Sequence, residues 1–415
     1  MYRIKNKLLA LALAVLMFGS VTGAAFLLNG SGSKGAVSAD NDGITLTEED
    51  ELKYADTSSA FDSSVVNIQP SVTGKQWLLV SLDGKPLAER RGDTDLTEYI
   101  NSEDGINADE DIRDQQKSFL SKLSKAGIPY DYKYGYTALT NTVAVCVDVK
   151  YADDIAEIKG VTSVNISEKY YAPQDEEVTN NANVHSTGIY QVDDSLGLDG
   201  EGMVAAVLDT GLDASHPAFT VEPENPKFSK EDVQQKIFES SLGGGFIGTL
   251  GQEATVDDVY YSSKVPFAYD YADKDTDVYP SYSHHGTHVA GIIAGADLQG
   301  QYLPGYTDTN GNLVDLDGNL MENANGAHMQ FTGVAPNAQL AICKVFSDNE
   351  VNGVVGLSEE MDILAALEDC VKLGVDVINM SLGSSAGFST GDNEMMTEVY
   401  DSVREAGIML SLIHI

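Results

Sequence analysis

The chain has 415 residues and a formal net charge of −39, from 64 acidic and 25 basic side chains. A surface this acidic repels phosphate backbones, which makes nucleic acid a poor partner. With 42% hydrophobic residues the chain can bury a sizeable core, and its length is sufficient for two or three domains.

The N-terminal segment has the pattern of a targeting sequence. Basic residues precede an apolar run over residues 8–28, and a series of small residues then ends in Val37-Ser38-Ala39. This pattern predicts a signal peptide over residues 1–39. The alternative is an uncleaved anchor, because the run is long enough to span a bilayer. No second long apolar run follows, so we expect the mature protein outside the cytoplasmic membrane.

Residues 40–74 are polar and acidic, which predicts a linker. The segment after it predicts a small α+β domain with the ferredoxin-like order β-α-β-β-α-β. The expected elements are a strand at 77–82, a helix at 112–126, a hairpin at 132–149, a short helix at 152–159 and a strand at 161–167.

From Gly202 onwards, continuous apolar strands alternate with helices. This alternation predicts an α/β fold with a doubly wound parallel sheet. The expected strands are at 203–208, 339–345, 375–380 and 408–413, and the expected helices at 286–294, 358–372 and 394–406. Two long polar stretches, 219–265 and 296–331, are predicted as functional or inserted loops.

An aspartate ends the first of these apolar strands. Asp209 follows Val207-Leu208 and precedes Thr210-Gly211. The carboxyl end of a buried strand lies at the ligand edge of such a sheet, and a carboxylate buried there needs a donor. Asp209 is therefore a candidate catalytic residue; the alternative is an aspartate that only caps a turn.

Residues 283–295 contain three histidines at the start of an expected helix. His285 can aim its ring into a cleft there, and histidine is the side chain best suited to move protons near neutral pH. Zinc binding is the alternative, because His284 and His288 are four residues apart. The missing HExxH glutamate and the poor helix former Gly286 argue against zinc.

The expected strand at 375–380 runs into Ser381-Leu382-Gly383. Such a strand end offers unpaired backbone donors and acceptors, which can bind an extended peptide as an added strand. The alternative is an ordinary exit from strand to loop.

Together these motifs resemble those of the subtilisin-like (subtilase) serine protease family. The aspartate motif is matched at Asp209, and the motif His-Gly-Thr-His-Val-Ala-Gly is matched residue for residue at His285–Gly291. Residues 333–338 match a Gly-Val-Ala-Pro-x-Ala strand entry, and Ser381–Gly383 match the substrate-binding strand. The resemblance covers roughly residues 185–411, in the order Asp then His that subtilisin has.

The resemblance implies a secreted serine endopeptidase precursor. A loop at 265–273 is similar to that of the large cell-envelope proteases of Gram-positive bacteria. Residues 75–172 resemble, by strand order and position, the family's propeptide, which assists folding and blocks the cleft until it is cleaved off. Residues 180–415 are then the peptidase domain, of a protein that is released or attached to the cell wall.

The family mechanism assigns a role to each matched residue. His285 would take the proton from a serine hydroxyl and return it to the leaving amine, while Asp209 would hold the imidazole. Ser381, Leu382 and Gly383 would bind the substrate backbone. The implied partners are protein or peptide substrates and the protein's own propeptide, and catalysis needs no cofactor.

The family's nucleophile and oxyanion motifs do not occur in these 415 residues. There is no Gly-Thr-Ser-Met-Ala string and no asparagine in an Ala-Gly-Asn setting, and residues 411–415 do not resemble the family's continuation. Ser381 is no substitute nucleophile, because its motif is the substrate strand. We therefore expect a C-terminally truncated peptidase domain without activity of its own.

The alternative function is a non-catalytic pseudo-protease or a propeptide-type protease-binding protein acting through 75–172. The presence of both Asp209 and His285 argues against a genuine pseudo-protease. A nucleotide-binding enzyme lacks any Gly-rich phosphate motif. The family often binds structural calcium, but the acidic loops 308–312 and 315–319 do not fit the EF-hand pattern, so no metal ligand is assigned.

Overall fold

The computed structural model describes residues 65–68, 71–172, 198–238, 255–296, 333–350, 354–382 and 394–412, with four two-residue strands between 302 and 329. All of these residues belong to one compact unit. The predicted signal peptide, most of the predicted linker, Gly383 and the two acidic loops lie outside the described residues. No helix in the described part of the chain is long and apolar enough to cross a membrane.

The first part of the described chain forms a five-stranded sheet in the order β1-β5-β2-β4-β3. Its strands are β1 (Val66–Asn67), β2 (Lys75–Leu82), β3 (Asp131–Tyr136), β4 (Thr142–Asp148) and β5 (Val161–Ile166). With the helices α4 (Glu103–Ala126) and α5 (Ala152–Ala156), strands β2 to β5 follow the predicted β-α-β-β-α-β order. Strand β1 pairs in parallel with β5, so part of the predicted linker belongs to the sheet.

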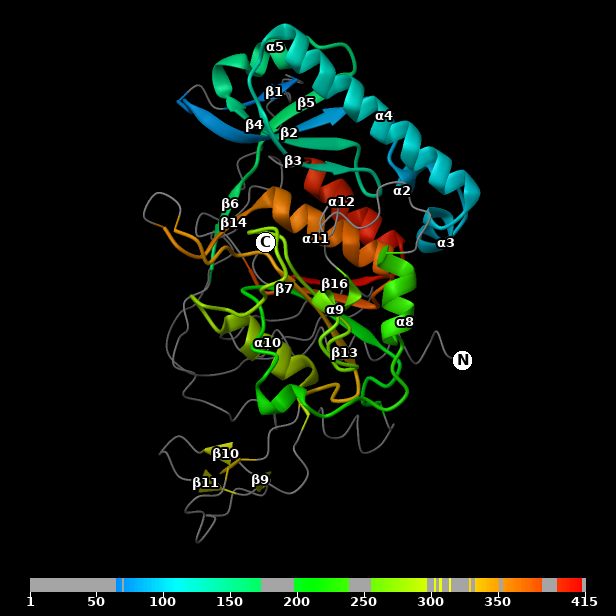
Figure 1. The fold of residues 1–415 in the computed structure, drawn as a ribbon, viewed down its shortest axis with the longest axis vertical. Coiled ribbons are helices and arrows are strands. Elements are labelled where there is room, and N and C mark those ends of the chain that lie inside the picture. Colours follow the sequence, from blue (N-terminus) through cyan, green and yellow to red (C-terminus); the bar gives the residue numbers. More distant parts are fainter. Residues whose placement is uncertain are drawn as a thin grey trace, which may run out of the picture. The chain divides into compact units, whose positions relative to one another are not determined.

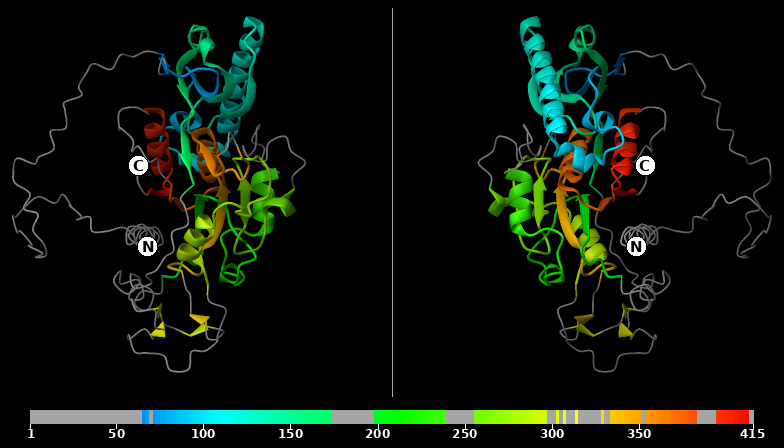
Figure 2. Two further views of the ribbon diagram at one scale, coloured as in Figure 1. Left: turned by 90° about the vertical axis from the view of Figure 1, so that its left-hand side faces the viewer. Right: turned by 90° about the vertical axis from the view of Figure 1, so that its right-hand side faces the viewer.

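The side chains of β2 alternate between two cores. Leu78 and Val80 pack with Phe119 of α4, whereas Leu79 belongs to a cluster shared with the helices of the second sheet. Figure 2 shows α4, in cyan, running along the sheet of its own domain. Because successive residues of a strand face opposite sides, one face of this sheet is covered by its own helices and the other by the following part of the chain.

Helix α4 begins at Glu103 rather than at the predicted Ile112. The Ser102 hydroxyl caps it by accepting from Gly105 N at 3.0 Å, and it ends at Gly127, whose φ of 73° is left-handed. The first turns carry exposed acidic residues and bury small ones, so they show no apolar periodicity. Two short helices before it, α2 (Leu87–Arg90) and α3 (Leu96–Ile100), are likewise absent from the predicted elements.

The second sheet has five strands in the order β16-β15-β7-β13-β8, and every neighbouring pair is parallel. Its strands are β7 (Val204–Asp209), β8 (Phe267–Asp270), β13 (Gln339–Lys344), β15 (Val377–Met380) and β16 (Met409–Leu412). The predicted parallel sheet is therefore confirmed, with β8 as an edge strand that the sequence analysis did not identify.

Helices cover both faces of this sheet, as the doubly wound prediction requires (Figure 1). Val204, Ala206 and Leu208 of β7 share a core with α11 (Glu360–Leu373) and α12 (Glu394–Glu405). Ala205 and Val207 share the other core with α10 (His285–Ala294).

Several short elements lie where loops were predicted. The stretch 219–265 contains α8 (Lys230–Val233), the π-helical turn η4 (Gln234–Phe238) and α9 (Val256–Val259). The stretch 296–331 contains β9 (Tyr302–Leu303), β10 (Tyr306–Thr307), β11 (Leu313–Val314) and β12 (His328–Met329). Two 3₁₀ turns, η2 (Val149–Tyr151) and η3 (Pro217–Phe219), complete the described helical segments.

A further two-stranded ladder joins the two parts of the chain. Strand β6 (Lys169–Tyr171) pairs antiparallel with β14 (Leu357–Glu359). The helix predicted to start at Ser358 therefore starts only after this strand, at Glu360. A three-residue strand held by a distant partner leaves too little pattern for a sequence-based prediction.

Candidate active site

Asp209 is the last residue of β7, and the alternation of that strand determines which way it faces. Ala205 and Val207 lie on the α10 side of the sheet, and Asp209 continues the same alternation. The residue is only 1% exposed, and its Oδ1 accepts a hydrogen bond from Thr210 N at 2.7 Å. The carboxylate therefore sits at the carboxyl edge of the sheet, beside the start of α10.

His285 is the first residue of α10, and it lies against Asp209. Its Nδ1 is 2.9 Å from Asp209 Oδ1 and 3.1 Å from Oδ2. A buried carboxylate therefore holds one side of the imidazole ring. The His285 side chain is 23% exposed, so the ring keeps access to solvent. The structure thus brings together two residues that the sequence analysis singled out separately.

The close approach of α10 to the Asp209 loop depends on glycine. A Cβ built on Gly286 would collide with Gly211 O and come within 3.1 Å of Asp209 Cβ. Gly211 itself has a φ of 111°, which a residue with a side chain rarely adopts. The two glycines therefore set the distance at which the aspartate and the histidine meet.

Thr210 ties the loop to the helix start. Its Oγ1 donates to Ser283 O at 2.8 Å and accepts from Gly286 N at 2.9 Å. Ser283 Oγ in turn accepts from His285 N at 3.3 Å. These bonds satisfy backbone groups at the helix N-terminus, which would otherwise lack partners, and they fix the backbone on both sides of His285.

Two of the residues predicted to bind the substrate backbone lie at the same edge of the sheet. Ser381 and Leu382 follow β15, which neighbours β7, and they are 8% and 5% exposed. In the register of the two strands Asn379 is opposite Val207, so Ser381 follows at the level of Asp209. The Ser381 hydroxyl accepts from Asn379 Nδ2 at 3.0 Å. Gly383, the third residue of the motif, lies outside the described residues.

The histidines proposed as an alternative zinc pair have other surroundings. His284 packs edge-on against Tyr279, with ring centroids 5.8 Å apart, and His288 N bonds to His284 O within the helix turn. Within the described ranges, no group of three or more His, Cys, Asp or Glu side chains is arranged to hold a metal ion.

A charged cluster beside the Asp209 loop was not found from the sequence. Lys344, the last residue of β13, is 2.6 Å from Asp270 Oδ2 and 2.9 Å from Asp348 Oδ2. Burial raises the pKa of Asp270 to about 7, against the attraction of the Lys344 ammonium. The sequence offered one signal for this cluster, a lysine directly after the apolar residues Ala341-Ile342-Cys343. The residue was assigned to the predicted strand and given no functional role.

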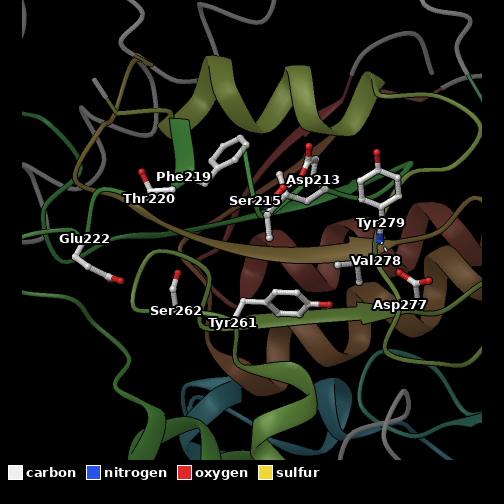
Figure 3. Close-up of a pocket in the computed structure, with 12 residues that line it drawn as sticks. Asp213, Ser215, Phe219, Thr220, Glu222, Tyr261, Ser262, Asp277, Val278 and Tyr279 are labelled. Atoms are coloured by element: carbon white, nitrogen blue, oxygen red, sulfur yellow. Dashed lines mark hydrogen bonds between the residues drawn. The ribbon is translucent and has the colours of Figure 1, made fainter. Parts of the chain in front are cut away.

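A cavity of about 520 Å³ opens beside the segment that follows Asp209 and Gly211. Figure 3 shows Asp213 and Ser215, which follow the Asp209 loop, facing Tyr261 and Asp277 across it. Neither Asp209 nor His285 lines this cavity, so it is separate from the aspartate–histidine pair.

The end of the α+β domain reaches the segment that precedes His285. Ala172 N donates to Gly356 O at 2.8 Å, continuing the β6–β14 ladder. A Cβ built on Gly356 would come within 2.6 Å of the Tyr282 ring and 3.0 Å of Ala172 Cβ. Ala172, Gly356 and Tyr282 are therefore neighbours. Tyr282 precedes His285 by three residues in the sequence.

Comparison with known proteins agrees with the arrangement. The sequence profile of the Subtilase family matches residues 200–411. The PII-type proteinase of Lacticaseibacillus paracasei is 30% identical over 272 residues, which cover 65% of this chain and 12% of that protein. The C5a peptidase of Streptococcus pyogenes is 27% identical over 214 residues, which cover 51% of this chain and 14% of that protein.

Among solved structures, fervidolysin from Fervidobacterium pennivorans is similar with a TM-score of 0.44 and 16% identity. The similarity covers 84% of this chain and 41% of that one. The chain thus spans less than half of fervidolysin and a small fraction of the curated relatives.

Proposed function

Because the chain belongs to the subtilase family, we propose that it forms part of an exported serine endopeptidase precursor that hydrolyses peptide bonds in proteins or peptides. The observation that carries this proposal is the hydrogen bond between the buried Asp209 carboxylate and His285 Nδ1. Its geometry is what a serine hydrolase needs to orient a general base.

In the proposed reaction His285 Nε2 accepts the proton of a serine hydroxyl as that oxygen attacks the substrate carbonyl. The same nitrogen then returns the proton to the leaving amine. Asp209 holds the ring in the tautomer with the proton on Nδ1 and stabilises the imidazolium. The transfer needs only protein side chains, so we propose no cofactor for catalysis.

We propose that Ser381, Leu382 and Gly383 bind the substrate backbone by strand addition at the edge that carries Asp209. Ser381 follows β15 at the level of Asp209, which supports this role. The nucleophile itself is not proposed among these 415 residues, because they contain no Gly-Thr-Ser-Met-Ala string.

We further propose that residues 75–172 act as a propeptide that folds on the peptidase domain and covers its cleft. The antiparallel addition of β6 to β14 supports this role, since it lays an extended segment whose end lies beside Tyr282, three residues before His285. On the face of the sheet, the hydroxyls of Tyr134 and Tyr136 donate to Tyr271 O and Met361 O, both at 2.7 Å.

A buried ion pair adds to this contact surface. Lys133 Nζ is 2.7 Å from Asp362 Oδ1, with the two side chains 14% and 3% exposed. The same ammonium donates to Ala272 O at 2.9 Å. Burial raises the pKa of Asp362 to about 7 while Lys133 opposes the rise. The domain is thus held on the peptidase part by polar contacts as well as by a shared apolar cluster.

A fluorophosphonate probe tests the proposed activity. The product of the full coding region should be labelled at a serine outside these 415 residues and should hydrolyse a peptide substrate, whereas the 415-residue chain should do neither. Labelling of Ser381, or turnover by the 415-residue chain, would contradict the assignment of the nucleophile. Absence of both labelling and turnover in the full product would favour a non-catalytic pseudo-protease instead.

A further inference from the structure

Lys344 occupies a position at the reactive edge that neither the family motifs nor the triad explains. It is the last residue of β13, and its Cα is the register partner of Asp209 on β7. Leu340 and Ile342 of the same strand face the α10 side, so Lys344 does too. Its side chain is only 2% exposed. A long charged side chain so deeply buried requires partners that offset the loss of hydration.

The partners are two carboxylates, one at the end of a strand and one in a loop. Asp270 ends the edge strand β8, and Asp348 follows β13 by four residues. Their oxygens lie 2.6 and 2.9 Å from Lys344 Nζ. The lysine is therefore an internal cation that joins the end of β8 to the loop after β13, at the edge of the sheet where Asp209 lies.

Asp348 also binds the backbone of the segment that precedes His285. Its two carboxylate oxygens accept from Ser281 N and Tyr282 N, each at 3.2 Å. The next residue, Ser283, accepts from His285 N and from the Thr210 hydroxyl. Fixing residues 281 and 282 therefore fixes the entry of the chain into α10 at its first residue.

The aliphatic part of the lysine supports the aspartate side of the pair. A Cβ built on Gly211 would come within 3.0 Å of Lys344 Cδ, so the methylene chain packs under the turn that follows Asp209. Val345 N donates to Asp209 O at 3.0 Å, which ties the same two strand ends through the backbone. Lys344 thus touches the supports of both Asp209 and His285 while contacting neither reacting group.

We propose that Lys344 is a positioning residue for the Asp209–His285 pair, acting through Asp348 and the backbone of Ser281 and Tyr282. The proposal rests on the proposed function, in which that pair is the proton-transfer unit. A cation is required because a neutral side chain would leave Asp270 and Asp348 without a buried counter-charge, and Asp348 would no longer be held over the 281–282 backbone.

The test uses the 415-residue chain and a spectroscopic signal of the pair itself. The proton between His285 Nδ1 and Asp209 should give a strongly deshielded line in one-dimensional proton NMR at low temperature, assigned by its loss in His285→Gln. We expect Lys344→Met to abolish this line while circular dichroism shows a folded chain. Absence of the line in the unsubstituted chain would overturn the proposal.

Lys372→Met is the matched control. Lys372 is also 2% exposed and also pairs with a carboxylate four residues away, Glu368 at 3.1 Å, but it lies in α11 rather than at the reactive edge. It should be destabilised in a similar way and keep the deshielded line. Loss of the line in Lys372→Met as well, or its survival in a folded Lys344→Met chain, would show that Lys344 has no positioning role.

A second variant keeps the test decisive if Lys344→Met does not fold. The Asp348 side chain is 24% exposed, so Asp348→Ala costs less burial energy and still removes the link to Ser281 and Tyr282. It too should lose the line, and retention of the line there would overturn the proposal. The two proposals can fail separately. If Lys344→Met and Asp348→Ala lose the line but the full-length product has no peptidase activity, the proposed function is refuted and the positioning role of Lys344 stands.

Discussion

The backbone N–H of Thr137 donates to the Glu368 carboxylate at 2.9 Å, and this bond joins the α+β domain to α11. The other oxygen of Glu368 accepts from Leu139 N at 3.4 Å, and Lys372 Nζ lies 3.1 Å from the first. Glu368 is fully buried. One carboxylate therefore satisfies backbone donors of the first domain and a lysine of the second.

Glu368→Ala should strongly destabilise the chain, because it removes the buried carboxylate that pairs with the Lys372 ammonium and accepts from two buried backbone N–H groups. Breaking a buried pair in this way costs about 3–5 kcal/mol in the free energy of unfolding. Urea unfolding followed by circular dichroism measures the loss.

Glu405→Ala is the control for this substitution. Glu405 also bridges the two parts, 3.2 Å from Arg91, but its side chain is 71% exposed. Exposed ion pairs contribute about 0–1 kcal/mol, so this variant should unfold almost like the unsubstituted chain. Equal losses in the two variants would mean that burial of Glu368 is not what makes its contact strong.

Lys264 should make the free energy of unfolding depend on pH in the neutral to alkaline range. It is fully buried, and its ammonium donates to Pro336 O at 2.6 Å and Ala338 O at 2.8 Å. Burial lowers its pKa to about 7 from the ordinary 10.5, with Glu222 acting in the opposite direction. Between these values the unfolded chain binds one more proton than the folded one. The free energy of unfolding therefore rises with pH between about 7 and 10.5. As pH falls over this range the contribution is lost, and below about pH 7 the destabilisation by Lys264 is complete and constant.

Lys264→Met removes this linkage. The slope of unfolding free energy against pH, measured between about pH 7 and 10, should fall by about 1.4 kcal/mol per pH unit relative to the unsubstituted chain. Lys85→Met, at a lysine 69% exposed, is the control and should leave the slope unchanged. Parallel slopes for the Lys264→Met and unsubstituted chains would show that Lys264 does not change its proton on unfolding.

The sign of the stability change in Gly286→Ala tests how closely α10 approaches the Asp209 loop. In a helix without tertiary contacts the change would stabilise by about 1 kcal/mol. Here the new Cβ would meet Gly211 O and Asp209 Cβ, so we expect a destabilisation of about 1–3 kcal/mol. The thermal unfolding midpoint should fall, and the deshielded histidine proton should weaken with it. A raised midpoint would mean that α10 does not approach the Asp209 loop this closely.

The parts of the fold that could be predicted are those in which local pattern and burial agree. β7 and β13 are buried on both faces, so they appear as continuous apolar runs, and α10 contains a histidine motif that is specific by itself. The first turns of α4 were missed because Gly105 and Ala108 bury little apolar surface there. The β6–β14 ladder was missed because three residues on each side pair across the chain, which no local pattern reveals.

The candidate site shows the same division. Asp209 and His285 could be identified because each lies in a motif. Their 2.9 Å contact, however, depends on the close approach of Gly286, at the start of α10, to Gly211 in the loop after β7. The role of Lys344 could not be predicted, because a lysine at the end of an apolar strand indicates no partner by itself. Asp270 and Asp348 come close to it only in the folded chain. Partners that come from separate loops are visible only in three dimensions.

The central claim is that Asp209 and His285 form the proton-transfer pair of a peptidase. Steady-state hydrolysis of a peptide by the full coding-region product, compared with its Asp209→Asn and His285→Ala variants, tests it most directly. We expect kcat to fall by about 10⁴-fold or more in each variant, while both remain folded. Hydrolysis at an unchanged rate by either folded variant would contradict it.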